Sequence, residues 1–276
     1  MSAPSDPGDA SFVKRRSDAP DGFFAAEAAG LSWLAEARSD GGAAVVDVLS
    51  LSRTEIRLRR LATARPTPAA AEAFGRALAV THRHGAPAHG SAAPGAGGQG
   101  WIGPLPLPVR DPDQVTGTTS SWGAFFATDR LQPFLHLAVD RRAIGPDDVR
   151  AVRRICDRLA AGDGELTGPE EPPSRLHGDL WSGNVLWTPQ GAVLIDPSAH
   201  GGHRESDLAM LALFGAPYLD QVLAAYHATW PLAPGWRRRV ALHQLFPLLV
   251  HAALFGSGYG SRAGAAARRC LTTAGC

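Results

Sequence analysis

The sequence contains almost no lysine, little cysteine and no long hydrophobic run. The three cysteines, Cys156, Cys270 and Cys276, are odd in number and are not spaced as metal ligands, so we expect reduced thiols. No stretch approaches the roughly 20 apolar residues of a membrane helix, and the first thirty residues lack the basic start and apolar block of a signal peptide. We therefore expect a cytoplasmic protein without a membrane partner.

Charge is also scarce. Only 19% of the residues are charged and the formal net charge is +1, which gives no basis for a nucleic-acid partner. A glycine-rich run at residues 95–100 lacks the Gly-Lys-Ser/Thr ending of a P-loop, so we expect a flexible loop there, with a part in acceptor binding as the alternative. At 276 residues and 45% hydrophobic content, the chain can bury a substantial core in one large domain or in two lobes.

One polar motif carries recognisable chemistry. The run at residues 175–186 reads RLHGDLWSGNVL, and residues 194–197 read LIDP. In kinase active sites an Asp accepts the proton of the attacking hydroxyl, an Asn five residues later binds one metal ion, and a further Asp on the next strand bridges magnesium to the phosphates. Asp179, Asn184 and Asp196 follow this order. The alternative is a capped turn between two strands, in which Asp179 and Asn184 only satisfy backbone amides.

The single lysine of the chain is the second feature. Of 27 Lys and Arg residues only Lys14 is a lysine, and it ends the strand-like segment at residues 11–14. Kinases use a strand lysine to contact the α- and β-phosphates and to pair with a glutamate on the next helix. Glu27, in a segment with helical spacing at residues 23–34, is the candidate partner. The alternative for Glu27 is a solvated helix acid.

The remaining pattern predicts an α+β fold with two lobes. Strands at 45–49 and 56–61 would complete a small sheet with the lysine strand, and Arg59, Arg60 and Leu61 fall where a kinase hinge would offer backbone groups to an adenine. Helical patterns follow at 69–84, 121–139, 146–161, 218–229 and 235–255. We expect a disordered leader at 1–10, an N-lobe at 11–61 and a helical C-lobe at 62–276. Asp207, which begins an apolar helix, is expected to cap it or to fix the catalytic loop by hydrogen bonds.

Several ordered motifs resemble the fructosamine (ketosamine) kinase family, which is related to the aminoglycoside phosphotransferases. They are FVK at 12–14, FAAEAAGL at 24–31, LHGDLWSGN at 176–184 and RESDLAM at 204–210, and the resemblance runs from about residue 11 to residue 262. It implies a two-lobed protein-kinase-like fold and the use of ATP and Mg²⁺. It also implies phosphorylation of a sugar hydroxyl of ketosamines on small amines or protein lysines, as a deglycation repair.

The same resemblance assigns roles to individual residues. It makes Asp179 the base, Asn184 and Asp196 the metal ligands, and Lys14 with Glu27 the pair that positions phosphate. Two further residues are expected to contact the acceptor, Trp181 by stacking on the sugar and His251 from a late helix.

The sequence departs from the family pattern at its front end. Family members carry two further strands and a glycine-rich turn before the lysine strand, whereas this chain begins about ten residues before that strand. The expected N-lobe therefore lacks the phosphate-covering loop. This leaves an inactive or nucleotide-binding kinase relative as one alternative, and an aminoglycoside or amino-alcohol phosphotransferase as another. The oligomeric state stays open.

Overall fold

The computed structural model describes residues 11–111 and 121–273, so the leader expected at residues 1–10 lies outside the described residues. The first sheet is antiparallel, with the strand order β1-β4-β3. These strands span Ser11–Arg15 (β1), Val48–Leu51 (β3) and Glu55–Arg59 (β4). Lys14 lies opposite Ile56 in the register of β1 and β4. The lysine strand thus belongs to a small sheet, as predicted, and lies at one edge of it.

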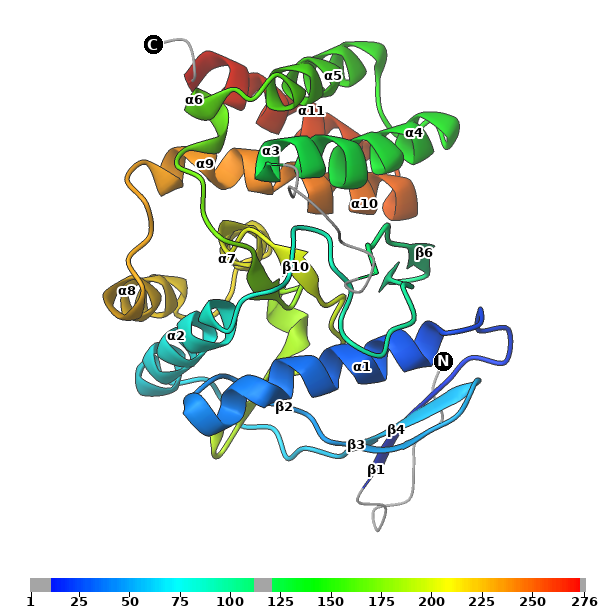
Figure 1. Cartoon of the computed structure of the whole chain (residues 1–276), viewed down its shortest axis with the longest axis vertical. Coiled ribbons are helices and arrows are strands. Elements are labelled where there is room, and N and C mark those ends of the chain that lie inside the picture. The colour runs from blue at the N-terminus through cyan, green and yellow to red at the C-terminus, as the bar shows by residue number, and fades with distance from the viewer. Residues whose placement is uncertain (1–10, 112–120, 274–276) are drawn as a thin grey trace.

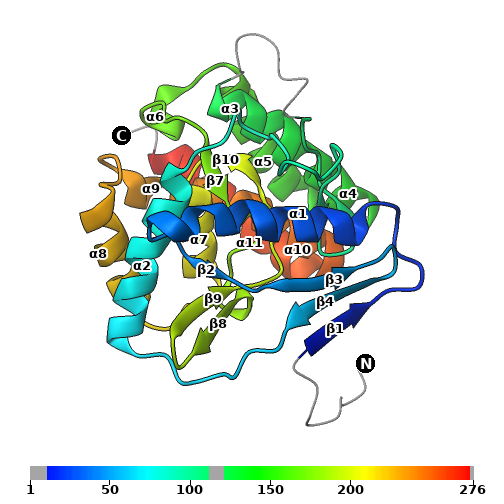
Figure 2. The ribbon, with the colours of Figure 1, turned by 60° about the horizontal axis from the view of Figure 1, so that its bottom comes forward.

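The strand expected at 45–49 is wrong in its extent, because the segment divides between two sheets. Ala44–Val45 forms β2, which pairs in parallel with β9 (Gly191–Leu194), and β9 also pairs with β8 (Val185–Thr188). Figure 2 shows β2 lying beside this hairpin while β3 continues into the first sheet. The chain thereby links the small sheet to the strands that flank the catalytic motif.

Helix α1 (Phe23–Ala35) connects the two parts of the molecule. It runs alongside β2 and β3 in Figure 2, and its buried residues include Phe24, Leu31 and Leu34. These side chains join one hydrophobic cluster with Ile56 of β4 and Leu194 of β9. A 3₁₀ helix, Glu36–Asp40, follows α1 directly. The N-terminal part therefore contains a single α-helix packed between its sheet and the rest of the chain.

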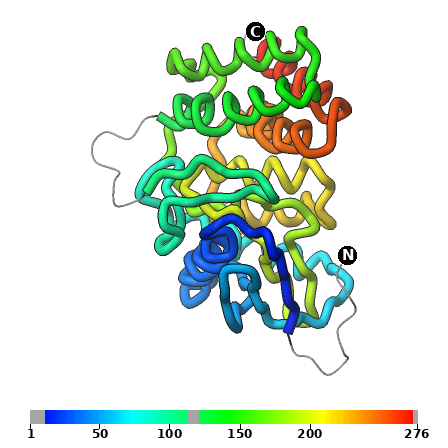
Figure 3. Tube along the Cα trace, turned by 90° about the vertical axis from the view of Figure 1, so that its right-hand side faces the viewer, coloured from blue at the N-terminus to red at the C-terminus, as the bar shows by residue number. Residues whose placement is uncertain are grey.

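The rest of the described chain is mainly helical, and most of its helices stack above the N-terminal part in Figures 1 and 3. The helices are α2 (Pro68–Arg83), α3 (Trp122–Phe125), the π-helical turn Phe126–Leu131, α4 (Gln132–Asp140), α5 (Pro146–Ala160), α6 (Gly164–Thr167), α7 (Glu205–Leu213), α8 (Leu219–Thr229), α9 (Trp236–His243), α10 (Leu245–Phe255) and α11 (Ser257–Thr273). Short strand pairs, β5 (Trp101–Ile102) with β6 (Leu105–Pro106) and β7 (Ser174–Leu176) with β10 (His200–Gly202), complete it.

The long helix expected at 235–255 is interrupted at Gln244, where α9 ends and α10 begins. Pro247 explains the interruption, because it has no N–H to donate to the carbonyl of His243 and its ring crowds that carbonyl. Leu242, Leu245 and Leu249 are nevertheless all buried, whereas Leu254 is only partly buried. Among the described residues, no helix is both long and apolar enough to span a membrane.

Candidate active site

The catalytic loop, residues 177–184, lies between β7 and β8 and ends in a 3₁₀ turn at Ser182–Asn184. The β8–β9 hairpin then brings the chain back, with Val185 opposite Leu194. The backbone N–H of Ile195 donates to the carbonyl of Asn184 at 3.1 Å. Because of this pairing Asn184 and Asp196, twelve residues apart, lie on the same side of the loop.

Asp179 and Asn184 are in direct contact. The Asn184 side-chain nitrogen donates to the Asp179 carbonyl oxygen at 2.8 Å and to its carboxylate oxygen Oδ2 at 3.1 Å. The same nitrogen lies 3.4 Å from the carbonyl oxygen of Asp196. Burial raises the pKa of Asp179 to about 7, against the opposing effect of the Asn184 hydrogen bond. A carboxylate with a pKa near neutrality is suited to accept a proton at physiological pH.

His177 and Asp207 hold the loop from behind. The Asp207 carboxylate accepts hydrogen bonds from the backbone N–H groups of His177 at 2.7 Å and Gly178 at 3.0 Å. It also accepts one from Nε2 of His82 in α2 at 3.1 Å. Asp207 lies in the first turn of α7 and is almost fully buried. Of the two roles expected for Asp207, the structure shows the hydrogen bonds to the catalytic loop.

The imidazole of His177 has a defined tautomer. Its Nε2 must donate to the carbonyl of Ile195 at 2.8 Å, so Nδ1 is left to accept the backbone N–H of Asp179 at 3.3 Å. Burial lowers the pKa of His177, which favours this neutral form. The ring therefore ties the loop to the strand that leads to Asp196.

Gly178 is required by its backbone and by its neighbours. Its φ of 81° lies in the left-handed region, and a Cβ at this position would lie 2.2 Å from the carbonyl oxygen of Ser198. An arginine, which protein kinases carry between the His and the Asp, has no room here. The catalytic loop of this chain is thus built against the segment that follows Asp196.

Lys14 contacts Glu27, the partner predicted from the sequence, and also Asp196. Its ammonium lies 2.7 Å from Glu27 of α1 and forms an ion pair with Asp196. Burial alone would lower the pKa of Lys14, but the two carboxylates raise it above its ordinary value, so the side chain is charged. The structure therefore brings Lys14, Glu27, Asp179, Asn184 and Asp196 together.

The residues expected to bind metal fit a hard divalent cation. Asp196 offers carboxylate oxygens, and the Asn184 amide, whose nitrogen faces Asp179, has its oxygen on the opposite branch. Oxygen ligands of this kind are those that Mg²⁺ prefers. Asp196 adopts a φ of 54°, a conformation that costs on the order of 1–3 kcal/mol outside glycine and that is typical of functional sites.

A cleft of about 420 Å³ opens above these groups. It is bordered by Lys14, Glu27, Asp179, Asn184, Asp196 and Trp181 and also by Arg16, Phe23 and Trp101, which sequence reasoning did not select. The sequence marks these residues only by their position near other site residues: Arg16 lies two positions after Lys14, and Phe23 begins the helix that carries Glu27.

The two acceptor residues predicted from the sequence, Trp181 and His251, are separated by the ring of Phe214. Trp181, at the cleft, is 40% exposed and its ring lies 6.2 Å from that of Phe214. The Phe214 ring in turn lies 4.7 Å from His251. His251 does not border the cleft itself, so Phe214 connects it to the catalytic loop.

The predicted hinge residues lie at the far end of β4, and the cleft lining described above does not include them. Arg59 is exposed and pairs with Asp47 at 2.7 Å, and Nε of Arg60 donates to the carbonyl of Ser11 at 3.2 Å. Leu61 is half-buried against the cluster beneath the sheet. Adenine binding at Arg59, Arg60 and Leu61 stays a prediction.

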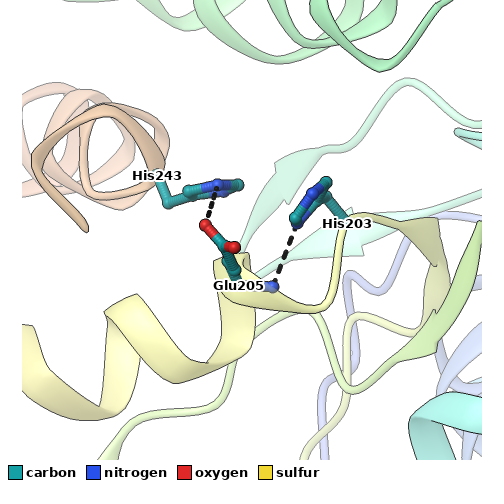
Figure 4. A group of neighbouring side chains, drawn as sticks. All are labelled: His203, Glu205 and His243. Carbon is teal, nitrogen blue, oxygen red and sulfur yellow. Dashed lines mark hydrogen bonds and ion pairs between the residues drawn. The ribbon is translucent and has the colours of Figure 1, made fainter. Parts of the chain in front are cut away.

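A second polar cluster is buried between α7 and α9 (Figure 4). His203, Glu205 and His243 have ligand-type atoms within 4.8 Å of one another. Arg239 holds both oxygens of Glu205, at 2.6 and 2.9 Å, and the Glu205 N–H donates to Nδ1 of His203 at 3.2 Å. Burial opposes ionisation of Glu205, but hydrogen bonds from His243 and Arg239 outweigh it and lower the pKa. Because the arginine already neutralises the carboxylate, we interpret the cluster as a structural link.

Similarity to known proteins shows the family of this chain. The family model for fructosamine kinase matches residues 4–273. The chain belongs to the fructosamine kinase family. A Thermus thermophilus protein assigned as a ketoamine kinase is 34% identical over 90% of this chain and 82% of its own length. A match to an Enterococcus faecium protein with the same assignment, at 36% identity, covers 54% of this chain and only 53% of the relative.

Solved structures show the fold of this family member. A Thermobifida fusca structure assigned as a fructosamine-3-kinase is 46% identical, with a TM-score of 0.84 over 95% of this chain and 85% of that one. An aminoglycoside phosphotransferase at 20% identity has a TM-score of 0.53 over 96% of this chain and 86% of that one, which shows a shared fold alone. The predicted two-lobed, protein-kinase-like α+β fold is confirmed.

Proposed function

We propose that this fructosamine kinase family member is an ATP- and Mg²⁺-dependent kinase that phosphorylates a sugar hydroxyl of ketosamines. The acceptors would be ribulosamine or fructosamine adducts of small amines or of protein lysines, and the activity would serve deglycation. The observation that carries the proposal is that Lys14, Glu27, Asp179, Asn184 and Asp196 meet at one cleft, in the order and chemistry that phosphoryl transfer requires.

Each residue has a defined task in this reaction. Asp179 accepts the proton of the sugar hydroxyl as that oxygen attacks, and its raised pKa of about 7, caused by burial, suits a base at neutral pH. Lys14, held by Glu27, neutralises phosphate charge. Asn184 and Asp196 would hold Mg²⁺, which supplies charge neutralisation between the phosphates. His177 and Asp207 keep the loop in the geometry that the transfer needs.

Trp181 beside the base, and His251 one ring further from it, are proposed to contact a sugar that carries an amine. Trp181 offers an exposed ring face next to Asp179. His251 donates through Nδ1 to the carbonyl of Pro247 at 2.7 Å, and burial lowers the pKa of the ring, so its Nε2 is free to accept a hydrogen bond. A ketosamine offers hydroxyl and ammonium donors for such an acceptor, and a cationic amine is attracted to aromatic faces.

The test is ADP release and phosphate transfer by the purified chain, with ribulosamine, fructosamine, the parent sugars, an aminoglycoside and choline as acceptors. We expect phosphorylation of a ketosamine only, loss of activity with a chelator and recovery with Mg²⁺. Asp179→Asn should lower kcat by about 10²–10⁴-fold, which is the usual contribution of a general base. Asp220→Asn, at an exposed position of α8, is the matched control. Wild-type turnover by Asp179→Asn, or activity on another acceptor class alone, would refute the proposal.

A further inference from the structure

Arg16 extends the positive charge of Lys14 along the cleft. The backbone N–H of Arg16 donates to the carbonyl of Thr54 at 3.0 Å, so the antiparallel pairing of β1 continues one residue beyond its end. Side chains two positions apart on a strand point to the same face, so Arg16 follows Lys14 on the cleft side, about 7 Å further along. The intervening Arg15 borders the cleft too, but its Nε is bonded to Glu55 at 2.6 Å.

The guanidinium of Arg16 is held in place by aromatic rings. It lies over the Phe23 ring, 4.9 Å from the centroid, and Phe23 packs on Trp101 with 5.4 Å between centroids. All three side chains border the same cleft as Lys14 and Asp196. Stacking of this kind limits the rotamers of an arginine, so less conformational entropy is lost when it binds an anion.

The only acid that contacts Arg16 within the described chain is a weak competitor. The Nε–Oδ1 distance to Asp18 is 3.3 Å, and the Asp18 side chain is 81% exposed. An ion pair with such an exposed partner contributes little, so an incoming phosphate can replace it. A guanidinium also matches phosphate oxygens with two parallel hydrogen bonds.

The direction of β1 decides which phosphate is reached. Ser11, at the start of the strand, lies opposite Arg59, where the adenine is expected, and Lys14 lies further along toward Asp196. A nucleotide that runs from the hinge past Lys14 would place its last phosphate beyond the lysine, on the side of Arg16. We propose that Arg16, stacked on Phe23, binds the terminal phosphate of the nucleoside triphosphate in this site. The proposal rests on the proposed function.

Calorimetric titration with two Mg²⁺-nucleotides, ADP and the non-hydrolysable β,γ-imido analogue of ATP, tests this contact without turnover. Arg16→Gln should weaken binding of the triphosphate analogue by about tenfold, the size expected for one charge-assisted hydrogen bond, and leave ADP affinity within twofold. Arg16→Lys, which keeps the charge and loses the planar fork, should fall between. Arg76→Gln, an exposed arginine on α2, is the control and should change neither affinity.

Two results would overturn the inference while the kinase function stands. Equal weakening of ADP and of the triphosphate analogue would place Arg16 at another phosphate or at the cleft in general. Unchanged affinities in Arg16→Gln would make the residue a surface arginine that only packs on Phe23. If the folded wild-type chain bound neither nucleotide, the proposed function and this inference would both fail.

Discussion

Removing the charge of Asp207 should loosen the catalytic loop without altering any group that borders the cleft. In Asp207→Asn the amide keeps one acceptor oxygen, so at least one of the two backbone donors, His177 N–H or Gly178 N–H, faces an NH₂ group and loses its partner. Hydrogen bonds to a charged group contribute about 1.5–3 kcal/mol, and a buried donor left unpaired costs about 1–3 kcal/mol. We therefore expect a loss of about 2–4 kcal/mol in the free energy of unfolding.

This loss should leave the protein folded, because domains are typically stable by about 5–15 kcal/mol. Urea unfolding followed by circular dichroism measures it, and Asp220→Asn should stay within about 0.5 kcal/mol of the wild type. The same variant should lower kcat by roughly tenfold to a hundredfold, because Asp179 follows the two anchored residues directly and small displacements of a reacting group are costly.

Hydrogen exchange separates this explanation from a general loss of stability. The amides of His177 and Gly178 should exchange faster in Asp207→Asn, at denaturant concentrations where the protein is still folded. An Asn variant with wild-type stability, kcat and exchange would refute the claim that Asp207 organises the loop. Wild-type exchange at these amides together with a large fall in kcat would place Asp207 in the chemistry itself.

Two further predictions concern the ion pairs of Glu27 and Glu205. Glu27→Gln leaves Lys14 with Asp196 as its acid in the described chain, so kcat/KM for ATP should fall by about tenfold or more, and Lys14→Met combined with it should cost little beyond Lys14→Met alone. Glu205→Gln should destabilise the fold by about 3–5 kcal/mol, because Arg239 loses its buried partner; thermal and urea unfolding measure this. The partners of Glu205 hold its pKa below the usual value despite burial. The stabilisation by the charged carboxylate is therefore complete above the usual glutamate pKa and is lost as pH falls toward the folded pKa. In Glu205→Gln, the free energy of unfolding should therefore depend less steeply on pH between about pH 5 and 2. An equally steep pH dependence of stability in Glu205→Gln would contradict the role given to the Glu205 charge.

The residues that meet at the cleft could be selected from the sequence because their chemistry restricts their spacing. Asp179 and Asn184 share one loop, Asp196 follows one hairpin later, and Lys14 is the only ammonium side chain available. Such constraints are local or compositional and need no knowledge of the fold. Their roles in catalysis are still predictions, but the contacts between Lys14 and Glu27 and between Asp179 and Asn184 are present in the structure.

Residues whose function depends on distant partners could not be selected in this way. His82 lies in a helix that the sequence predicts correctly, but nothing in its spacing shows that it bonds Asp207, 125 positions later. The division of residues 44–51 has the same cause, because β2 pairs with β9, which lies about 150 residues further along the chain. Parallel pairing of this kind leaves no short-range signal in the alternation of side chains.

The position of the site follows from one shared core. Leu34 of α1, Leu180 of the catalytic loop and Leu194 of β9 are all fully buried, and they belong to a single hydrophobic cluster that also contains Ile56 of the first sheet. The sheet that contains the Lys14 strand, the helix that carries Glu27 and the loop that carries Asp179 therefore all contribute side chains to the same cluster. Because close-packed interiors resist small displacements, this packing fixes the distance from Lys14 to Asp196 through the core as well as through their own charges.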